Sequence, residues 1–173
     1  MRACPAPAAA ASALQWLATQ VIIRNPCVWR AICLCENLNQ HQCWGEGMDH
    51  KQTIVLRKDL NMRKGKMIAQ GAHASMRAIL MLGHQDAGNF VIPLDERLEP
   101  WLLGRFKKIC VSVNSEAELF ALHEASKAAG LIAALIQDAG LTEFGGVPTY
   151  TALAVGPDRA DRVDAITGAL PLL

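Results

Sequence analysis

Residues 52–76 read QTIVLRKDLNMRKGKMIAQGAHASM, and this stretch contains the two elements that decide the fold. Its start is rich in β-branched and aliphatic residues, which predicts a short strand at Gln52–Arg57. After a polar turn, recurring apolar positions predict a helix from about Lys64 to Leu82. A strand that leads into a helix in this way is typical of an α/β domain.

Three polar side chains lie on one line of this helix. Lys66, Gln70 and His73 are spaced i, i+4 and i+7, which stacks them on one face. The residues beside them are small, namely Gly71, Ala72, Ala74 and Ser75. Such a face is either hydrated or shaped to meet a ligand.

The rest of the chain after residue 82 alternates between strand and helix patterns. Ser115 and Glu118 form a capping box that opens a helix, and Gly130 closes it. The other predicted elements are a short helix near Asp95–Leu103, strands at Lys108–Val113, Ile132–Gln137 and Thr151–Val155, and a last helix at about Asp158–Thr167 capped by Gly168. This order predicts a three-layer α/β/α domain with a mixed, mainly parallel sheet of about four strands, one of them reversed.

The composition of the chain changes at Met48. Five of the six cysteines and three of the four tryptophans precede it, and residues 1–47 show no pattern that would pack into a core. We therefore expect one domain at residues 48–173. We expect the leader, residues 1–47, to be disordered or absent from the native protein, because purine-rich codons for Gly-Glu-Gly before Met48 would resemble a ribosome-binding site.

Two alternatives remain open for the leader. Its few acids and scattered arginines also fit a transit peptide, whereas its apolar run falls short of a membrane span. Zinc is the second alternative, although the spacing of the candidate ligands matches no common structural site. These candidate ligands are Cys27, Cys33, Cys35, His41 and Cys43.

Charge is distributed unevenly along the chain. The formal net charge is +1, but Lys51 to Arg77 contains seven basic residues and one acid, a local charge of +6. Arg105, Lys107 and Lys108 form a second basic cluster. We expect the folded domain to present one positive face that could bind a nucleic acid, with ordinary solvated charge as the alternative.

Polar residues follow the predicted strands where chemistry is often found in open α/β sheets. Asp138 comes after the apolar run LIAALI and Gln137, and Thr142 and Thr151 lie further along the chain. Lys66 lies in the first turn of the helix after the first strand, so we expect it at the same end of the sheet, where the strands have their carboxyl ends. A carboxylate and an ammonium there keep each other ionised and could orient a water and balance an oxyanion.

Bland interpretations of the same residues remain open. Asp138 could be a turn residue, Lys66 a surface lysine and His73 a hydrogen-bonded core histidine. The sequence contains no phosphate-binding glycine loop, no dinucleotide fingerprint, no nucleophile elbow and no paired-cysteine metal spacing after Met48. A catalytic site here is therefore expected to use neither a metal nor a cofactor.

Three separated motifs resemble the type II peptidyl-tRNA hydrolases, a family found in archaea, eukaryotes and some bacteria. They are LRKDLNMRKGKMIAQGAHA at 56–74, LIQDAGLTEF at 135–144, and TALAVGP with ITGALPLL at 151–173. The resemblance implies a mixed four-stranded sheet between helices, a homodimer, and metal-free hydrolysis of the ester that joins a peptide to the 3′ end of tRNA. It further implies a cytoplasmic role in translation and ribosome rescue, with no membrane partner, and we take the chain for a bacterial member.

The resemblance also implies roles for individual residues. The catalytic set is Lys66, Asp138, Thr142 and Thr151, in which Asp138 would orient and deprotonate water and Lys66 would hold it ionised. Gln70 and His73 would contact the substrate, and the small residues beside them would let the RNA end and the ester approach. The residues expected to grip tRNA phosphates are Arg57, Arg63, Lys64, Arg105, Lys107 and Lys108.

The chain departs from the family pattern at a few positions, which are Ile68, Leu141, Asp158 and Arg159. None of them removes a titrating group of the expected catalytic set. Two other functions remain open: a non-catalytic RNA-binding module on the same scaffold, and an esterase that acts on a small acyl compound.

Overall fold

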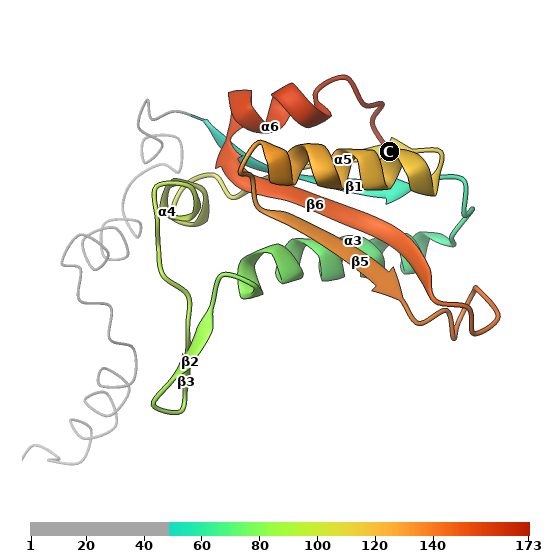
Figure 1. Ribbon diagram of the computed structural model, residues 1–173, viewed down its shortest axis with the longest axis horizontal. Helices are drawn as coiled ribbons and strands as arrows, with labels where there is room; N and C mark the ends of the chain where they lie inside the picture. Colours follow the sequence, from blue (N-terminus) through green and yellow to red (C-terminus); the bar gives the residue numbers. More distant parts are fainter. Residues whose placement is uncertain (1–48) are drawn as a thin grey trace, which may run out of the picture. The chain divides into compact units, whose positions relative to one another are not determined.

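The computed structural model describes residues 49–173, so the predictions for the leader fall outside the described residues. Four strands form one mixed sheet in the order β4-β1-β6-β5, and helices cover both of its faces (Figure 1). The elements are β1 (His50–Arg57), α3 (Lys64–Leu80), β2 (His84–Asp86), β3 (Asn89–Val91), α4 (Leu98–Leu102), β4 (Lys107–Val113), α5 (Glu116–Ala128), β5 (Ala133–Asp138), β6 (Thr149–Arg159) and α6 (Ala160–Thr167).

The sheet has the mixed character that the sequence predicts. β1 runs parallel to β4 and antiparallel to β6, and β6 runs antiparallel to β5. Three strands therefore share one direction and β6 is reversed, as expected from its short connection to β5. The carboxyl ends of β1 and β5 consequently lie at the same end of the sheet.

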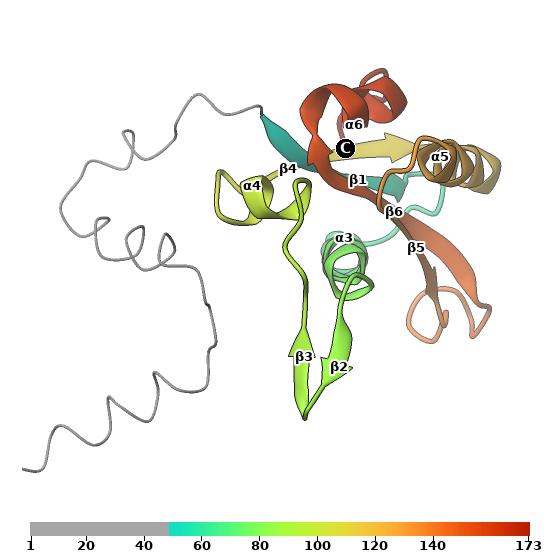
Figure 2. The same ribbon diagram turned by 60° about the vertical axis from the view of Figure 1, so that its left-hand side comes forward.

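Two hydrophobic cores lie on the two faces of the sheet. Ile54 and Leu56 of β1 pack under α3, whereas Val55 between them packs with Leu119 of α5 and Val163 of α6. Successive side chains of a strand point to opposite faces, so one strand supplies both cores. Figure 2 shows α3 on one side of the sheet, with α5 and α6 on the other.

The small residues of α3 face the sheet. Gly71, Ala74 and Ser75 are buried, and a Cβ atom at Gly71 would lie 3.6 Å from Ile54 Cγ2. The expectation that the small residues let a ligand approach is therefore wrong for these three. They let the helix approach the strands, and only Ala72 of the four is exposed.

A hairpin formed by β2 and β3 was not predicted. It projects from the domain beside α3, and all of its strand residues are exposed (Figure 2). Its turn places Ala87 at φ 45° and Gly88 at φ 83°. Because neither strand buries a face, neither shows the alternation from which strands are recognised.

β6 also extends beyond its predicted end at Val155 to Arg159, and α6 begins only at Ala160. Asp158 is therefore a strand residue, whose buried carboxylate accepts hydrogen bonds from the Arg159 backbone N–H at 2.7 Å and Arg162 Nη1 at 2.8 Å.

The chain end covers one edge of the sheet. The Ser112 N–H of β4 donates to the Pro171 carbonyl at 2.9 Å, and the Leu173 N–H donates to the Cys110 carbonyl at 3.2 Å. The tail thus pairs with the outer edge of β4, where an exposed strand would otherwise present open backbone groups. The opposite edge is formed by β5.

The predicted capping box at the start of α5 is present and gives a stability prediction. Ser115 Oγ accepts from the Glu118 N–H at 3.2 Å, and Glu118 Oε2 accepts from the Asn114 N–H at 2.9 Å. Ser115→Ala should lower the free energy of unfolding in urea by about 1 kcal/mol. Ser115→Asp keeps an acceptor and serves as the control; an equal loss in both variants would contradict this role.

Candidate active site

The site centres on an ion pair between the first turn of α3 and the end of β5. Lys66 Nζ lies 2.7 Å from Asp138 Oδ2, and the two side chains are only 11% and 16% exposed. They meet because β1 and β5 have their carboxyl ends at the same end of the sheet, and α3 starts near that end. A partly buried pair is screened less by solvent than a surface pair.

Asp138 accepts hydrogen bonds on both carboxylate oxygens. Gln70 Nε2 donates to Oδ1 at 2.9 Å, and the Gly140 N–H donates to Oδ2 at 2.9 Å beside Lys66. The hydrogen bond from Lys66 is the main cause that lowers the pKa of the Asp138 carboxyl. The bonds from Gly140 and Gln70 lower it further, while burial opposes them. The group is therefore an anion at neutral pH.

The two predicted threonines occupy different places in this network. Lys66 Nζ donates to Thr142 Oγ1 at 3.0 Å, so Thr142 contacts the ion pair directly. Thr151 Oγ1 donates to Gln70 Oε1 at 2.6 Å, and both side chains are almost completely buried. Because the Gln70 carbonyl is occupied by Thr151, its amide NH₂ is turned toward Asp138.

Thr151 reaches Gln70 because β6 contains a bulge. The pairing steps from Ile136 with Ala152 to Gln137 with Tyr150, so Thr151 is the extra residue. Ala152 packs in the core under α3, whereas Tyr150 packs against the other core. The bulge therefore turns both Thr151 and Ala152 toward α3, as bulges near functional sites often re-aim a side chain.

Gly140 fixes the loop that follows Asp138. Its φ is +79°, and a Cβ atom there would lie 2.1 Å from the Val147 carbonyl oxygen. Only glycine combines this conformation with so close a backbone approach. The tight turn brings the Gly140 N–H back onto the Asp138 carboxylate and brings Thr142 to Lys66.

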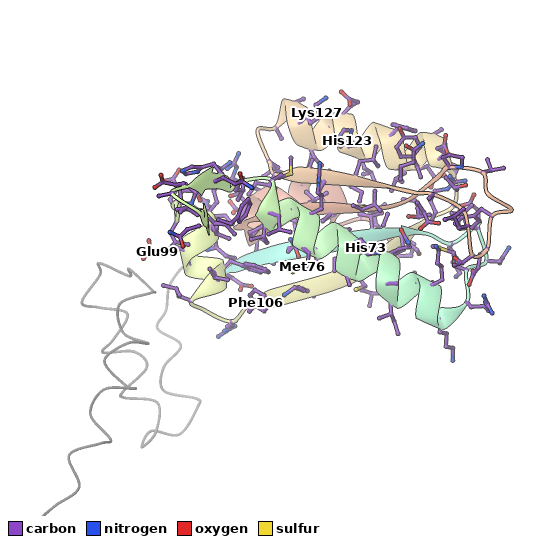
Figure 3. All side chains as sticks on the ribbon, turned by 90° about the horizontal axis from the view of Figure 1, so that it is seen from below. His73, Met76, Glu99, Phe106, His123 and Lys127 are labelled. Carbon is purple, nitrogen blue, oxygen red and sulfur yellow. The ribbon has the colours of Figure 1, made fainter. Side chains whose placement is uncertain are left out.

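A pocket of about 420 Å³ opens beside Asp138, between α3 and the end of β5. Figure 3 shows two of its residues, His73 and Met76, on α3. The lining residues are Gln70, His73, Met76, Arg77, Leu80, Ile136, Gln137, Asp138 and Ala139. The arrangement offers a carboxylate, an ammonium and an adjoining space for a substrate. No group of three His, Cys, Asp or Glu side chains within residues 49–173 is arranged to hold a metal.

Comparison with known proteins identifies the family. The sequence profile of the family described as "Peptidyl-tRNA hydrolase PTH2" matches residues 50–173. The chain belongs to this family. The match covers almost all of the domain that contains the Lys66–Asp138 pair.

Curated relatives agree with this membership. A protein of Methanopyrus kandleri named peptidyl-tRNA hydrolase is 42% identical over 124 residues, which cover 72% of this chain and 98% of the relative. Proteins of the same name from Methanocaldococcus jannaschii (39% over 123 residues, covering 71% and 99%) and Aeropyrum pernix (42% over 130 residues, covering 74% and 98%) are also similar. These relatives are archaeal, so the expected bacterial origin stays a prediction.

The basic residues of the PTH2 domain do not form the single face that the sequence suggested. Arg63 and Lys64 are exposed at the start of α3, beside the ion pair, although Arg63 Nε also contacts Glu143 Oε1 at 2.8 Å. Arg105 lies just before β4, and Lys107 and Lys108 are the first residues of β4, which starts beside α4 at the opposite end of the sheet (Figure 2).

Several of these cations already have partners within the PTH2 domain. The Arg57 side chain is 10% exposed and contacts both Asp59 and Glu116 at 2.7 Å, which does not favour a phosphate contact. Lys51, which contributed to the local charge of the sequence, is buried and paired with Asp164.

In the second cluster, Lys107 contacts Asp49 at 2.7 Å. Lys108 Nζ lies over the Phe106 ring, 3.1 Å from its centroid, and burial lowers the pKa of this ammonium. Arg105 is exposed.

Sequence reasoning missed other residues around the PTH2 site. Phe144 lies with its ring centroid 5.6 Å from Lys66 Nζ, and Glu143 holds Arg63. The pocket residues Met76 and Leu80 were also missed. They continue the helical spacing of Gln70 and His73 along one side of α3, so that spacing could have indicated them.

The ion pair gives a prediction for the titration of Asp138. The pKa of its carboxyl should lie below the usual value of about 3.9. Lys66→Met should raise this pKa, because the main stabilising donor is lost while burial remains. As the pH falls, the variant should therefore become protonated before the unchanged protein does. Carboxyl carbon NMR measures both titrations.

Thr142→Val is the control for this titration, because it leaves the Lys66–Asp138 contact in place. An Asp138 pKa that does not change in Lys66→Met would show that Lys66 has no part in holding the carboxylate ionised.

Proposed function

We propose that this domain hydrolyses the ester that joins a peptide to the 3′ end of tRNA, with Lys66 and Asp138 at the reacting centre. The observation that carries the proposal is the partly buried 2.7 Å ion pair beside a pocket, in a member of the PTH2 family. The family resemblance supplies the substrate, and the pair supplies groups suited to a hydrolytic water attack.

Asp138 acts on the attacking water. Its Oδ2 already accepts from Lys66 and Gly140, whereas Oδ1 accepts only from Gln70 among the described residues. Oδ1 therefore has an open lone pair beside the pocket, where it holds a water molecule and takes its proton as the water oxygen attacks the ester carbonyl. The tetrahedral intermediate then collapses: the bond between the carbonyl carbon and the ribose oxygen breaks, and the proton passes from Asp138 to that oxygen, which leaves as a hydroxyl.

Lys66 acts on the charge that develops. Two of its three N–H groups point to Asp138 and Thr142, and the third is available to the carbonyl oxygen as it becomes negative. Because this third N–H needs no movement of Lys66, the ammonium stabilises the oxyanion while it stays paired with Asp138. Neither role requires a metal or a cofactor.

Thr142 and Gln70 orient these two groups. Thr142 holds the ammonium from the loop side, and Gln70 holds the carboxylate from the helix side. Thr151 is a positioning residue in this scheme, since it acts on Asp138 through Gln70. His73 lies at the pocket and contacts the substrate rather than the ion pair.

The tRNA backbone binds beside the start of α3. Arg63 and Lys64 are exposed next to the reacting centre and attract phosphates without reading the base sequence. Arg105, Lys107 and Lys108 contact only a more distant part of a long RNA, because they lie at the other end of the sheet. Arg57 is not part of this interface, because its side chain is largely buried and paired with Asp59 and Glu116.

The wider setting is proposed from the sequence. Residues 48–173 constitute the functional domain, which acts as a homodimer in a bacterial cytoplasm, in translation and ribosome rescue. Cys110 is the sole cysteine after Met48, which suits a reducing compartment. Within residues 49–173, none of the helices is both long and apolar enough to cross a membrane.

Replacement of Asp138 tests the reaction. With N-acetyl-aminoacyl-tRNA as substrate, Asp138→Asn should lower the rate of release by about 10²- to 10⁴-fold, because the neutral amide cannot take a proton. A chelator should leave the unchanged protein active. Full activity in Asp138→Asn, or loss of activity with the chelator, would require another mechanism.

Bare tRNA distinguishes this activity from that of a small-molecule esterase. It should compete with the substrate, because phosphate contacts supply much of the affinity. Absence of competition would favour the esterase.

The tRNA surface is tested by salt dependence. Lys64→Ala should weaken tRNA binding and reduce the slope of log K against log salt by about 0.7 to 0.9, the value for one lost phosphate contact. Lys127→Ala is the matched control, since it removes an exposed cation from α5, on the other face of the sheet, and should leave the affinity and the slope unchanged. If Lys64→Ala changes neither affinity nor slope, Lys64 does not bind phosphate.

A further inference from the structure

One edge of the sheet is open beside the active site. β4 forms one edge, and the chain end at Pro171 and Leu173 covers it with two hydrogen bonds. β5 forms the other edge, and no strand of residues 49–173 lies beyond it (Figures 1 and 2). The unpaired backbone groups of such an edge are a template for another extended chain.

The hydrogen-bond pattern identifies which groups point outward. The Gly156 N–H donates to the Ile132 carbonyl at 2.8 Å, so Ile132 and Gly156 form a hydrogen-bonded pair of the antiparallel ladder. Such pairs alternate with non-hydrogen-bonded ones, so Ala134 and Ile136 also point their backbone groups to β6. Ala133 and Leu135 then point their N–H and C=O groups away from the sheet. Within residues 49–173, no backbone segment pairs with these outward groups.

This edge leads directly to the reacting centre. β5 ends at Asp138, and its last residues Ile136 and Gln137 line the pocket with Met76 and Leu80 of α3. From Gln70 to Leu80 the helix rises by about 15 Å, which matches four to five residues of an extended chain at about 3.3 Å each. The pocket therefore has the length for a short strand.

The positions of the charged and apolar residues indicate which part of the substrate lies on each side of the Lys66–Asp138 pair. Lys64 lies before Lys66 on α3, and the pocket residues Met76 and Leu80 lie after Gln70. Phosphates attracted to Lys64 place the RNA on one side of the ion pair. The other part of the substrate then extends along the pocket, where Met76, Leu80 and Ile136 offer apolar surface and the exposed Arg77 lies beside them.

We propose that the peptide part of the substrate binds as an added strand on the outer edge of β5. This inference rests on the proposed function. β5 runs toward Asp138, so a peptide whose C-terminal ester carbonyl lies at Asp138 runs parallel to it. Its backbone pairs with the outward N–H and C=O groups of Ala133 and Leu135, and alternate side chains face the pocket or the solvent.

Strand pairing explains how one site can accept many peptides. Backbone hydrogen bonds do not depend on the side chains, so recognition is insensitive to peptide sequence. A free aminoacyl-tRNA has no amide N–H or C=O to offer to this edge. The edge therefore favours substrates with at least one peptide bond, and longer peptides gain further contacts.

The test uses the full chain with peptidyl-tRNAs that share one tRNA and carry acetylated alanine peptides of one to four residues. The kcat/KM should rise with length. N-methylation at each peptide bond in turn should lower it by about two- to tenfold at alternate positions only, because only alternate N–H groups face β5. Replacing an alanine by valine at the same positions is the control and should have little effect.

Amide hydrogen exchange provides a second measurement. A non-hydrolysable analogue, with an amide in place of the ester, should slow exchange at Ala133 and Leu135. The amides of Ala134 and Ile136, already bonded to β6, should change little. If a higher protein concentration alone protects the outward amides, a second copy of the chain occupies the edge and the inference is overturned.

The two proposals fail in different ways. Equal kcat/KM for all lengths, with no effect of N-methylation while Asp138→Asn still abolishes release, overturns the strand inference and leaves the hydrolase function standing. Absence of hydrolysis for every substrate overturns the proposed function itself, together with the inference that rests on it.

Discussion

Lys66 and Gln70 reach Asp138 because α3 lies close to the sheet, and it lies close because the residues in that contact are small. Gly71, Ala74 and Ala78 of the helix face a core that includes Ala152 and Ala154 of β6. Larger side chains at these positions would push the helix away from the sheet, because the interior is close-packed. The packing of small core residues therefore sets the geometry of the Lys66–Asp138 network, and a core substitution would alter that geometry without replacing any of its residues.

Two backbone irregularities complete what this packing begins. The bulge at Thr151 turns an additional side chain toward α3, and the positive φ of Gly140 folds the following loop back onto Asp138. Both act on a network in which nearly every polar atom has a partner, from Thr151 through Gln70 and Asp138 to Lys66. A connected network of this kind resists reorganisation during reaction, which is how preorganised sites lower a barrier.

Much of the domain could be predicted because each main element buries one face. The alternation of Ile54, Val55 and Leu56 is a property of the local sequence, and so is the capping box at Ser115. The contact between Lys66 and Asp138 could be predicted because the strands before them end at the same end of the sheet. The hairpin of β2 and β3 has no buried face, and the Thr151–Gln70 bond depends on a bulge that no local pattern announced. Charge was the weakest guide, because Glu116 and Asp164 neutralise cations far away in the chain.

That internal pairing changes how the domain looks to a polyanion at long range. With Lys51 and Arg57 matched by carboxylates, the exposed cations of the two basic clusters, Arg63 and Lys64 in one and Arg105 in the other, lie at opposite ends of a nearly neutral domain. Two positive ends on a nearly neutral domain orient it relative to an approaching RNA. They raise the rate at which the two molecules meet much less.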